Sequence, residues 1–184
     1  MNPDLSPTTG SAENDLYQEL VMEHKRAPRN FGHLPHPSHQ ARGTNPQCGD
    51  DLTVELVIQN HQVQDIRFSG QGCAICMASA SMMSEAVKGH GVDAALQLQQ
   101  HFRAVLTGQS EPDAAYLGKL ISLNGVRRYP SRIKCALLGW HALQHALAGP
   151  VPGSGTAAET ERAQTVAPVP ISSNFLPPSA KSNP

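Results

Sequence analysis

The residues most suited to chemistry in this sequence are cysteines that lie in three distinct local settings. Cys48 and Asp50 are separated by a single glycine just before an expected strand, so a thiol and a carboxylate can turn toward one point. Cys73 follows Gly70 and Gly72 at an expected junction between a strand and a helix. A thiol at a helix N-terminus meets unpaired backbone N–H groups and the positive end of the helix dipole, which lower its pKa and favour the thiolate.

The third cysteine has basic neighbours. Arg132 and Lys134 precede Cys135 near the expected start of the last helix. Positive charge close to a thiol stabilises the thiolate and lowers the pKa of the thiol. We therefore expect Cys135 to ionise readily, with Arg132 among the groups that keep it ionised.

These residues supply four ligands of two chemical classes. Three thiolates and one carboxylate are enough for a tetrahedral zinc ion or for the protein ligands of a [2Fe–2S] cluster. A carboxylate is a harder and poorer ligand for a soft metal than a thiolate, so Asp50 is the ligand expected to exchange. The pattern predicts a metal site that exchanges ligands, formed by Cys48, Asp50, Cys73 and Cys135.

Structural explanations for the same residues stay open at this point. A single cysteine is often a small buried apolar residue, and an aspartate after a glycine often caps a turn. Cys73 and Cys76 also form a C-x-x-C pair, which in a βαβ context is typical of thioredoxin-like redox proteins. The sequence shows no βαβ pattern, so we prefer a metallo-thiol domain.

Composition excludes several classes of protein. The 184 residues suffice for one folded domain, and a net charge of −1 with a pI of about 6.7 predicts no basic surface for nucleic acid. No apolar run reaches about 18 residues, so no membrane span is expected. The polar N-terminus does not resemble a secretory signal. We expect a cytoplasmic protein whose cysteines are reduced.

Composition also divides the chain into three parts. Residues 1–14 are polar and are expected to form a flexible leader. Residues 149–184 are rich in proline, serine and alanine and contain too few apolar residues to offset the entropy of ordering, so we expect a disordered tail. All four cysteines fall within residues 15–148, which we predict to be the single folded domain.

Hydrophobic periodicity predicts an α+β architecture. Alternating apolar residues predict a β-hairpin with a tight turn at Asn60 and His61, and the loop before it has room for a first strand. The first helix is expected to bury Leu16, Leu20 and Met22. The expected elements are strands over 52–58 and 63–69 and helices over 15–26, 73–88, 95–108, 115–123 and 131–148. We predict a small antiparallel sheet of about three strands with helices packed on one face.

At these residues the chain resembles the family of iron–sulfur cluster scaffolds that contains IscU and the N-terminal domain of NifU. The matching segments cover most of residues 16–148. They are Leu16-Tyr17, Met22, His24, Pro28-Arg29-Asn30, Asn45 to Asp50, Gly70 to Cys73, Met77 to Met83 and Arg132 to Ala136. By this resemblance, Cys48, Asp50, Cys73 and Cys135 are the metal-site residues.

Within this family the chain resembles the SufU type more than the IscU type. Lys134 stands where the IscU type has a histidine ligand. The segment 125–131 replaces the chaperone-docking segment expected before Cys135. The 61 residues between Cys73 and Cys135 also resemble the insertion of the SufU type.

The resemblance implies that this set binds zinc and that the protein accepts sulfur from a cysteine desulfurase of the SufS type. We expect Cys135 to be the sulfur acceptor, with Arg132 stabilising its thiolate or docking the partner. In the main alternative, the same four residues bind iron as a transient [2Fe–2S] cluster and pass it to downstream assembly or acceptor proteins. A structural zinc module that only binds partners is a third interpretation. If it transfers sulfur, the protein is a sulfurtransferase that acts with a cysteine desulfurase; otherwise it is a non-enzymatic scaffold.

One position departs from the family pattern. Cys76 stands where a serine is expected, one helical turn after Cys73. It could be a spare ligand, a resolving thiol or a residue without a chemical role. The sequence does not choose among these three roles.

Overall fold

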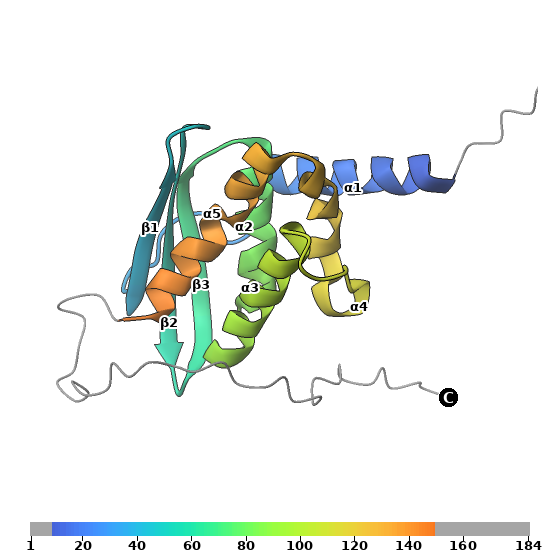
Figure 1. The fold of residues 1–184 in the computed structure, drawn as a ribbon. Helices are drawn as coiled ribbons and strands as arrows, with labels where there is room; N and C mark the ends of the chain where they lie inside the picture. Colours follow the sequence, from blue (N-terminus) through green and yellow to red (C-terminus); the bar gives the residue numbers. More distant parts are fainter. Residues whose placement is uncertain (1–8, 150–184) are drawn as a thin grey trace, which may run out of the picture.

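The computed structural model of the protein describes residues 9–149 and shows an α+β domain (Figure 1). After one helix the chain forms a three-stranded sheet, and the remaining helices follow. The elements in chain order are α1 (Thr9–Arg26), β1 (His39–Asn45), β2 (Asp50–Gln59), β3 (Gln62–Gln71), α2 (Ala74–Val87), α3 (Val92–Leu106), α4 (Ala114–Leu117), the 3-10 helix η1 (Gly118–Arg128) and α5 (Pro130–Leu147). The predicted fold class is confirmed.

The sheet is antiparallel, with the strands in the order β1-β2-β3. Strands β2 and β3 form the predicted hairpin, and both residues of its turn, Asn60 and His61, have positive φ values of 51° and 59°. Such a pair matches a type I′ turn, whose twist suits antiparallel strands. At the far end of β3, a Cβ on Gly70 would lie 2.1 Å from the carbonyl oxygen of Asp51, so only glycine fits there.

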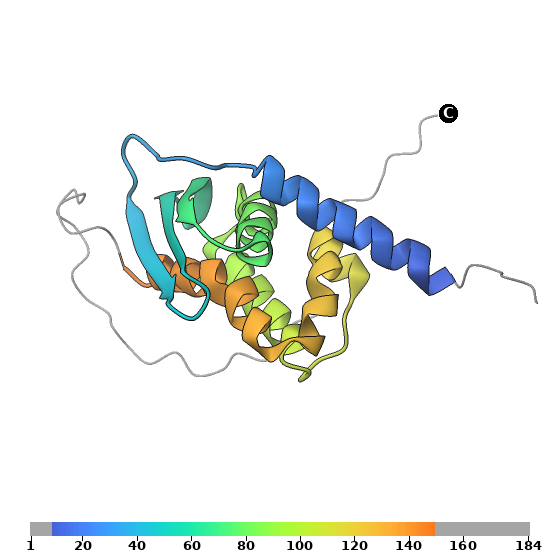
Figure 2. The same ribbon diagram turned by 90° about the horizontal axis from the view of Figure 1, so that it is seen from above.

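Helices α2 and α5 cover one face of the sheet (Figure 1, Figure 2). Helix α5 lies across β1 and β2, while α2 packs against β3 and against α5. The two helices approach closely because a Cβ on Gly139 of α5 would lie 3.3 Å from the Cβ of Ala80 in α2. Leu52, Val54 and Leu56 of β2 are fully buried beneath them, and each such side chain stabilises the fold by about 1.5–3 kcal/mol.

Helix α1 differs from its prediction at its start and in the face that it buries. Residues 9–14, assigned to the leader by composition, are helical, since no proline interrupts their backbone hydrogen bonds. Val21 is buried, whereas Met22, expected to face inward, is 38% exposed. That prediction is wrong because the face of the helix that carries Val21 and His24 packs on α2 and on the segment 118–128, and Met22 lies beside that face. The side chain of Leu16 lies outside the described part of the structure.

The expected helix over residues 115–123 is also different in the structure. Helix α4 ends at Leu117, where Gly118 takes a positive φ of 53° that breaks the α-helix. The chain continues as the 3-10 helix η1, which buries Leu120 and Leu123. A spacing of three between apolar residues suits a 3-10 helix as well as an α-helix, so periodicity alone could not separate the two.

The predicted disordered tail lies outside the described residues from residue 150 on, as do residues 1–8. The domain boundary near residue 148 therefore stays a prediction. Within residues 9–149, no helix combines the length and the apolar character needed to cross a membrane.

Candidate metal centre

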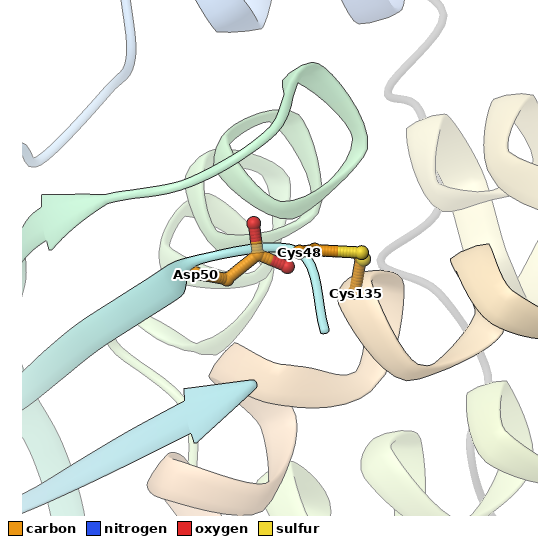
Figure 3. Close-up of side chains that lie close together, drawn as sticks. All are labelled: Cys48, Asp50 and Cys135. Carbon is orange, nitrogen blue, oxygen red and sulfur yellow. The ribbon is translucent and has the colours of Figure 1, made fainter. Parts of the chain in front are cut away.

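Two distant parts of the chain bring three of the predicted ligands together. The turn between β1 and β2 carries Cys48 and leads into Asp50, while α5 supplies Cys135. One ligand atom from each of the three residues lies within 4.8 Å of the other two (Figure 3). Asn45 holds this arrangement, because its carbonyl accepts the N–H of Cys48 at 3.2 Å and its side-chain amide donates to the Sγ of Cys135 at 3.4 Å.

Asp50 has an environment that suits a metal ligand better than a simple turn cap. The residue is only 2% exposed. Its Oδ1 accepts the backbone N–H of Cys73 at 2.8 Å, whereas its buried Oδ2 has no hydrogen-bond partner in the described part of the chain. An unsatisfied buried carboxylate oxygen is costly, and a cation bound here would remove that cost. The residues present therefore fit a metal ion.

Cys73 lies at the helix N-terminus, as predicted. It is the N-cap residue of α2, and its Sγ accepts the N–H of Cys76 at 3.5 Å. Its Sγ does not belong to the group of atoms that all lie within 4.8 Å of one another. It does interact with Cys135, whose pKa it helps to raise. Binding of one metal by all four predicted ligands therefore requires this sulfur to approach the other three atoms.

Cys135 differs from its prediction in both position and charge. Helix α5 begins at Pro130, which places Cys135 in the second turn, where it is fully buried. Burial is the largest effect on this thiol and, together with the nearby side chains of Asp50, Cys48 and Cys73, raises its pKa well above the ordinary value. The expectation that basic neighbours keep Cys135 ionised is wrong for the metal-free site, because closeness in sequence says nothing of burial. Metal binding would require the thiol to ionise.

Only one of the two basic neighbours reaches the thiols. The Nη1 of Arg132 lies 3.8 Å from the Sγ of Cys48. The neighbouring thiols, that of Cys135 first, raise the pKa of this guanidinium. Lys134 turns away, with its Nζ 3.5 Å from the Oε1 of Gln47. Arg132 is therefore the exposed cation that faces the cysteines.

Cys76, whose role the sequence leaves open, lies at the inner side of the centre. It is fully buried, and burial followed by the charge of Asp50 raises the pKa of its thiol well above the ordinary value. Gly72 lies between the thiol and the carboxylate. A Cβ on Gly72 would be 2.9 Å from the Sγ of Cys76 and 3.1 Å from the Oδ1 of Asp50.

Fold and site together define a class of protein. A small α+β domain that gathers thiols and a buried carboxylate from its sheet and its helix ends is a metallo-thiol domain, suited to zinc or iron. The chain belongs to the NifU-like N-terminal domain family, whose sequence model matches residues 16–148. The predicted family is confirmed.

Relatives match the same part of the chain. The chain is 40% identical over 133 residues to the zinc-dependent sulfurtransferase SufU of Bacillus subtilis (strain 168), covering 72% of this chain and 90% of that protein. It is 37% identical over 134 residues to the iron–sulfur cluster assembly scaffold protein IscU of Streptococcus pyogenes serotype M1, covering 73% and 84%. A crystal structure of an iron–sulfur cluster assembly scaffold protein for the SUF system from Fervidobacterium islandicum AW-1 matches with a TM-score of 0.68 and 31% identity, over 73% of this chain and 98% of that one.

Proposed function

We propose that the protein is a zinc-dependent sulfur acceptor in iron–sulfur cluster assembly, with zinc held by Cys48, Asp50, Cys73 and Cys135. The observation that carries the proposal is the buried Asp50 carboxylate, which lies beside the thiols of Cys48 and Cys135 and has one oxygen without a partner among the residues that the structure describes. Buried polar groups in proteins are almost always paired, and a divalent cation would pair this one. The relative from Bacillus subtilis, named as a zinc-dependent sulfurtransferase, supports the choice of zinc.

Sulfur acceptance needs a thiolate that stays protected until the donor arrives. Bound zinc supplies this, since it keeps its thiol ligands deprotonated and masks them. In the proposal, Cys135 would be freed as a thiolate when the donor docks and would attack the outer sulfur of the donor's persulfide. The sulfur–sulfur bond of the donor breaks, the donor cysteine leaves as a thiolate, and Cys135 carries the persulfide. Cys48, Asp50 and Cys73 hold the metal meanwhile.

The donor in this proposal is a cysteine desulfurase of the SufS type in the cytoplasm. A groove of about 530 Å³ adjoins the centre, and its lining includes Ala74, Arg132, Met22 and Tyr129. Met22 and Tyr129 are 38% and 61% exposed and line the same groove, and such a grouping of exposed large side chains supports a protein partner at this surface. Arg132 lies between the groove and the thiols, so it can act on either.

A scaffold for a transient [2Fe–2S] cluster is the second candidate function. Thiolates are the usual protein ligands of such clusters, and the Streptococcus pyogenes relative is named as a scaffold. The same four residues would then hold iron, and the cluster would pass to downstream assembly or acceptor proteins. A structural zinc module is the outcome left if the protein binds zinc but takes up no sulfur.

Metal analysis combined with persulfide loading separates these functions. We expect the protein purified under reducing conditions to carry about one zinc ion per chain. Incubation with a cysteine desulfurase and cysteine should add the mass of one sulfur atom to the wild-type protein and none to Cys135→Ser. Bound iron and sulfide would favour the scaffold. Added sulfur on Cys73 or Cys76, and never on Cys135, would contradict the assigned acceptor.

Arg132→Ala tests the guanidinium separately from the ligands. Zinc should be retained, while sulfur transfer should slow roughly tenfold, which corresponds to about 1.4 kcal/mol at the transition state. Lys134→Ala is the matched control, because Lys134 faces Gln47 rather than the thiols. Slower transfer at saturating desulfurase assigns Arg132 to the thiolate, and weaker desulfurase binding assigns it to docking. Equal effects of the two substitutions would remove both roles.

A further inference from the structure

Cys76 has no part in the ligand set proposed above, yet it adjoins that set. Three of the four proposed ligands, Asp50, Cys73 and Cys48, are close enough for their charges to act on the Cys76 thiol. The backbone N–H of Cys76 also donates to the Sγ of Cys73 at 3.5 Å. Cys76 therefore forms part of the inner wall of the centre, although it is fully buried.

At Gly72 the Cys76 thiol and the Asp50 carboxylate both approach the same point of the backbone. The Sγ of Cys76 and the Oδ1 of Asp50 lie 2.9 Å and 3.1 Å from the place that a Cβ would take on Gly72. Gly72 is not among the glycines with positive φ, so its backbone conformation does not require glycine. Space does require it, since a Cβ would press on both groups. Because position 72 has no side chain, the thiol and the carboxylate both fit around this point.

The position of Cys76 along α2 suits metal binding. Cys73 is the N-cap of the helix, and Cys76 is its third residue. Two cysteines separated by two residues are a common chelating pair for a single zinc ion. Thiolates are also softer ligands for zinc and iron than carboxylates. The Sγ of Cys76 and the Oδ1 of Asp50 lie at most 6.0 Å apart, the sum of their 2.9 Å and 3.1 Å distances from the place of a Cβ on Gly72, so a softer donor is near if the carboxylate of Asp50 leaves the metal.

We propose that Cys76 is a reserve metal ligand that takes the place of Asp50, changing the centre from three thiolates and one carboxylate to four thiolates. This inference rests on the metal centre of the proposed function. The bond from the metal to the Asp50 oxygen breaks, a bond to the Cys76 sulfur forms, and the thiol proton passes to water, so no oxidant or reductant is needed. The four-thiolate form is closed, as in structural zinc sites, whereas the carboxylate form is open to exchange.

Cobalt(II) bound in place of zinc reports the number of thiolates, because thiolate-to-cobalt charge-transfer absorption grows with that number. The full-length protein, Asp50→Ala, Cys76→Ser and the double variant are loaded with cobalt under reducing conditions. Asp50→Ala should keep cobalt and gain about one third in charge-transfer intensity, since four thiolates replace three. Cys76→Ser alone should match the wild type. The double variant should lose the gain and bind metal at least about tenfold more weakly than Asp50→Ala.

Two further variants control for packing and for charge. Cys76→Ala removes the sulfur without adding a hydroxyl to the core, so it should repeat the Cys76→Ser result. Asp51→Ala removes a neighbouring carboxylate that accepts hydrogen bonds from Arg42 and should leave the cobalt spectrum unchanged. Thermal unfolding of each variant verifies that it is folded. The gain expected in Asp50→Ala does not depend on the Cys76 variants.

Several results would overturn the inference. Asp50→Ala could bind cobalt at wild-type intensity or lose the metal altogether, and either result denies that Cys76 replaces the carboxylate. A lower intensity in Cys76→Ser alone would make Cys76 a permanent ligand instead of a reserve one. Failure of the proposed function looks different. The wild type would then bind no metal, or would bind it in a way that Cys48→Ser and Cys135→Ser leave unchanged, and both proposals would fall.

Discussion

Helix α2 contributes to two buried polar regions that are constructed in opposite ways. Near its N-terminus, the metal centre leaves the Oδ2 of Asp50 without a hydrogen-bond partner among residues 9–149. Further along the helix, Ser81 and Ser84 belong to a hydrogen-bond network that ties α2 to the end of α1 and to the residues that follow it. We call this second region the serine network.

In the serine network the protein supplies almost every partner itself. The hydroxyl of Ser81 accepts the N–H of Arg29 at 2.8 Å and lies 2.7 Å from the Nδ1 of His24. The hydroxyl of Ser84 donates to the carbonyl of Ser81 at 2.7 Å. Within the described residues the Nε2 of His24 has no hydrogen-bond partner, although the Oε2 of Glu85 lies 3.7 Å away.

The contrast separates a region that holds the fold from one that needs a ligand. A buried network in which most of the polar groups are paired, as here with the exception of the Nε2 of His24, stabilises one arrangement of the chain. A buried carboxylate beside thiols lacks a partner until a cation arrives, and soft ligands around it can exchange. We therefore expect changes in the two regions to have separate effects on metal binding and on stability.

Removal of the metal should have the largest effect and should act on the metal centre. A ligand that binds only the folded state stabilises it by about 2.7 kcal/mol when its free concentration is about 100 times its Kd. Chelation should therefore lower the melting temperature and speed alkylation of the thiols, and added zinc should reverse both changes. Because the ligands must deprotonate, zinc affinity should also weaken as the pH falls. Unchanged stability and thiol reactivity after chelation would contradict the centre.

Ser81→Ala should destabilise the protein without loss of zinc. The substitution leaves the N–H of Arg29 and the Nδ1 of His24 without their partner, which should lower the free energy of unfolding by about 1–3 kcal/mol. Ser110→Ala is the control, because the Ser110 hydroxyl makes one long contact of 3.5 Å with the Glu111 carbonyl. Chemical unfolding and zinc analysis give both readouts. A loss of zinc affinity in Ser81→Ala would show that the two regions are coupled.

His24 should contribute to the pH dependence of stability. Burial is the largest effect on His24 and lowers its pKa, with the charge of Glu85 opposing. As the pH falls, the unfolded chain therefore binds a proton at His24 before the folded protein does. The stability that neutral His24 contributes is complete above the unfolded pKa of about 6.5 and is lost as the pH falls below that value toward the lower pKa of the folded state. His24→Gln should flatten the decline of unfolding free energy below about pH 7, measured at fixed zinc.

His36→Gln serves as the control for this measurement, because His36 is exposed. It should decline with pH as the wild type does. If the unfolding free energy of His24→Gln declines with pH as steeply as that of the wild type and of His36→Gln, the serine network does not hold a neutral histidine.

Deletion of residues 150–184 should have the smallest effect of all. The segment is rich in proline and poor in apolar residues, and such segments do not bury enough surface to order themselves. The melting temperature and the sulfur uptake should equal those of the full chain. A large drop in melting temperature would show that the tail packs on the domain.

The sequence alone identified the elements whose signals are local. The turn at Asn60 and His61 follows from the residue types that tolerate positive φ. The helix that begins after Cys73 follows from the two glycines before it and the change to helical spacing. Local spacing was insufficient in the first helix, where apolar residues lie next to each other. It could not decide whether the face with Val21 or the face with Met22 is buried.

The tertiary structure alone decided how the candidate ligands meet and what surrounds them. Asn45 and Cys135 are in contact although 90 positions separate them in the chain, and no sequence spacing could show that. The charge of Cys135 was wrongly predicted for the same physical reason. Charged neighbours can be read along the sequence, but burial depends on every element packed around a residue, and here it outweighs the nearby cations. The closeness of Cys76 to Asp50 is likewise a product of packing, through the space that Gly72 leaves between a helix and a strand.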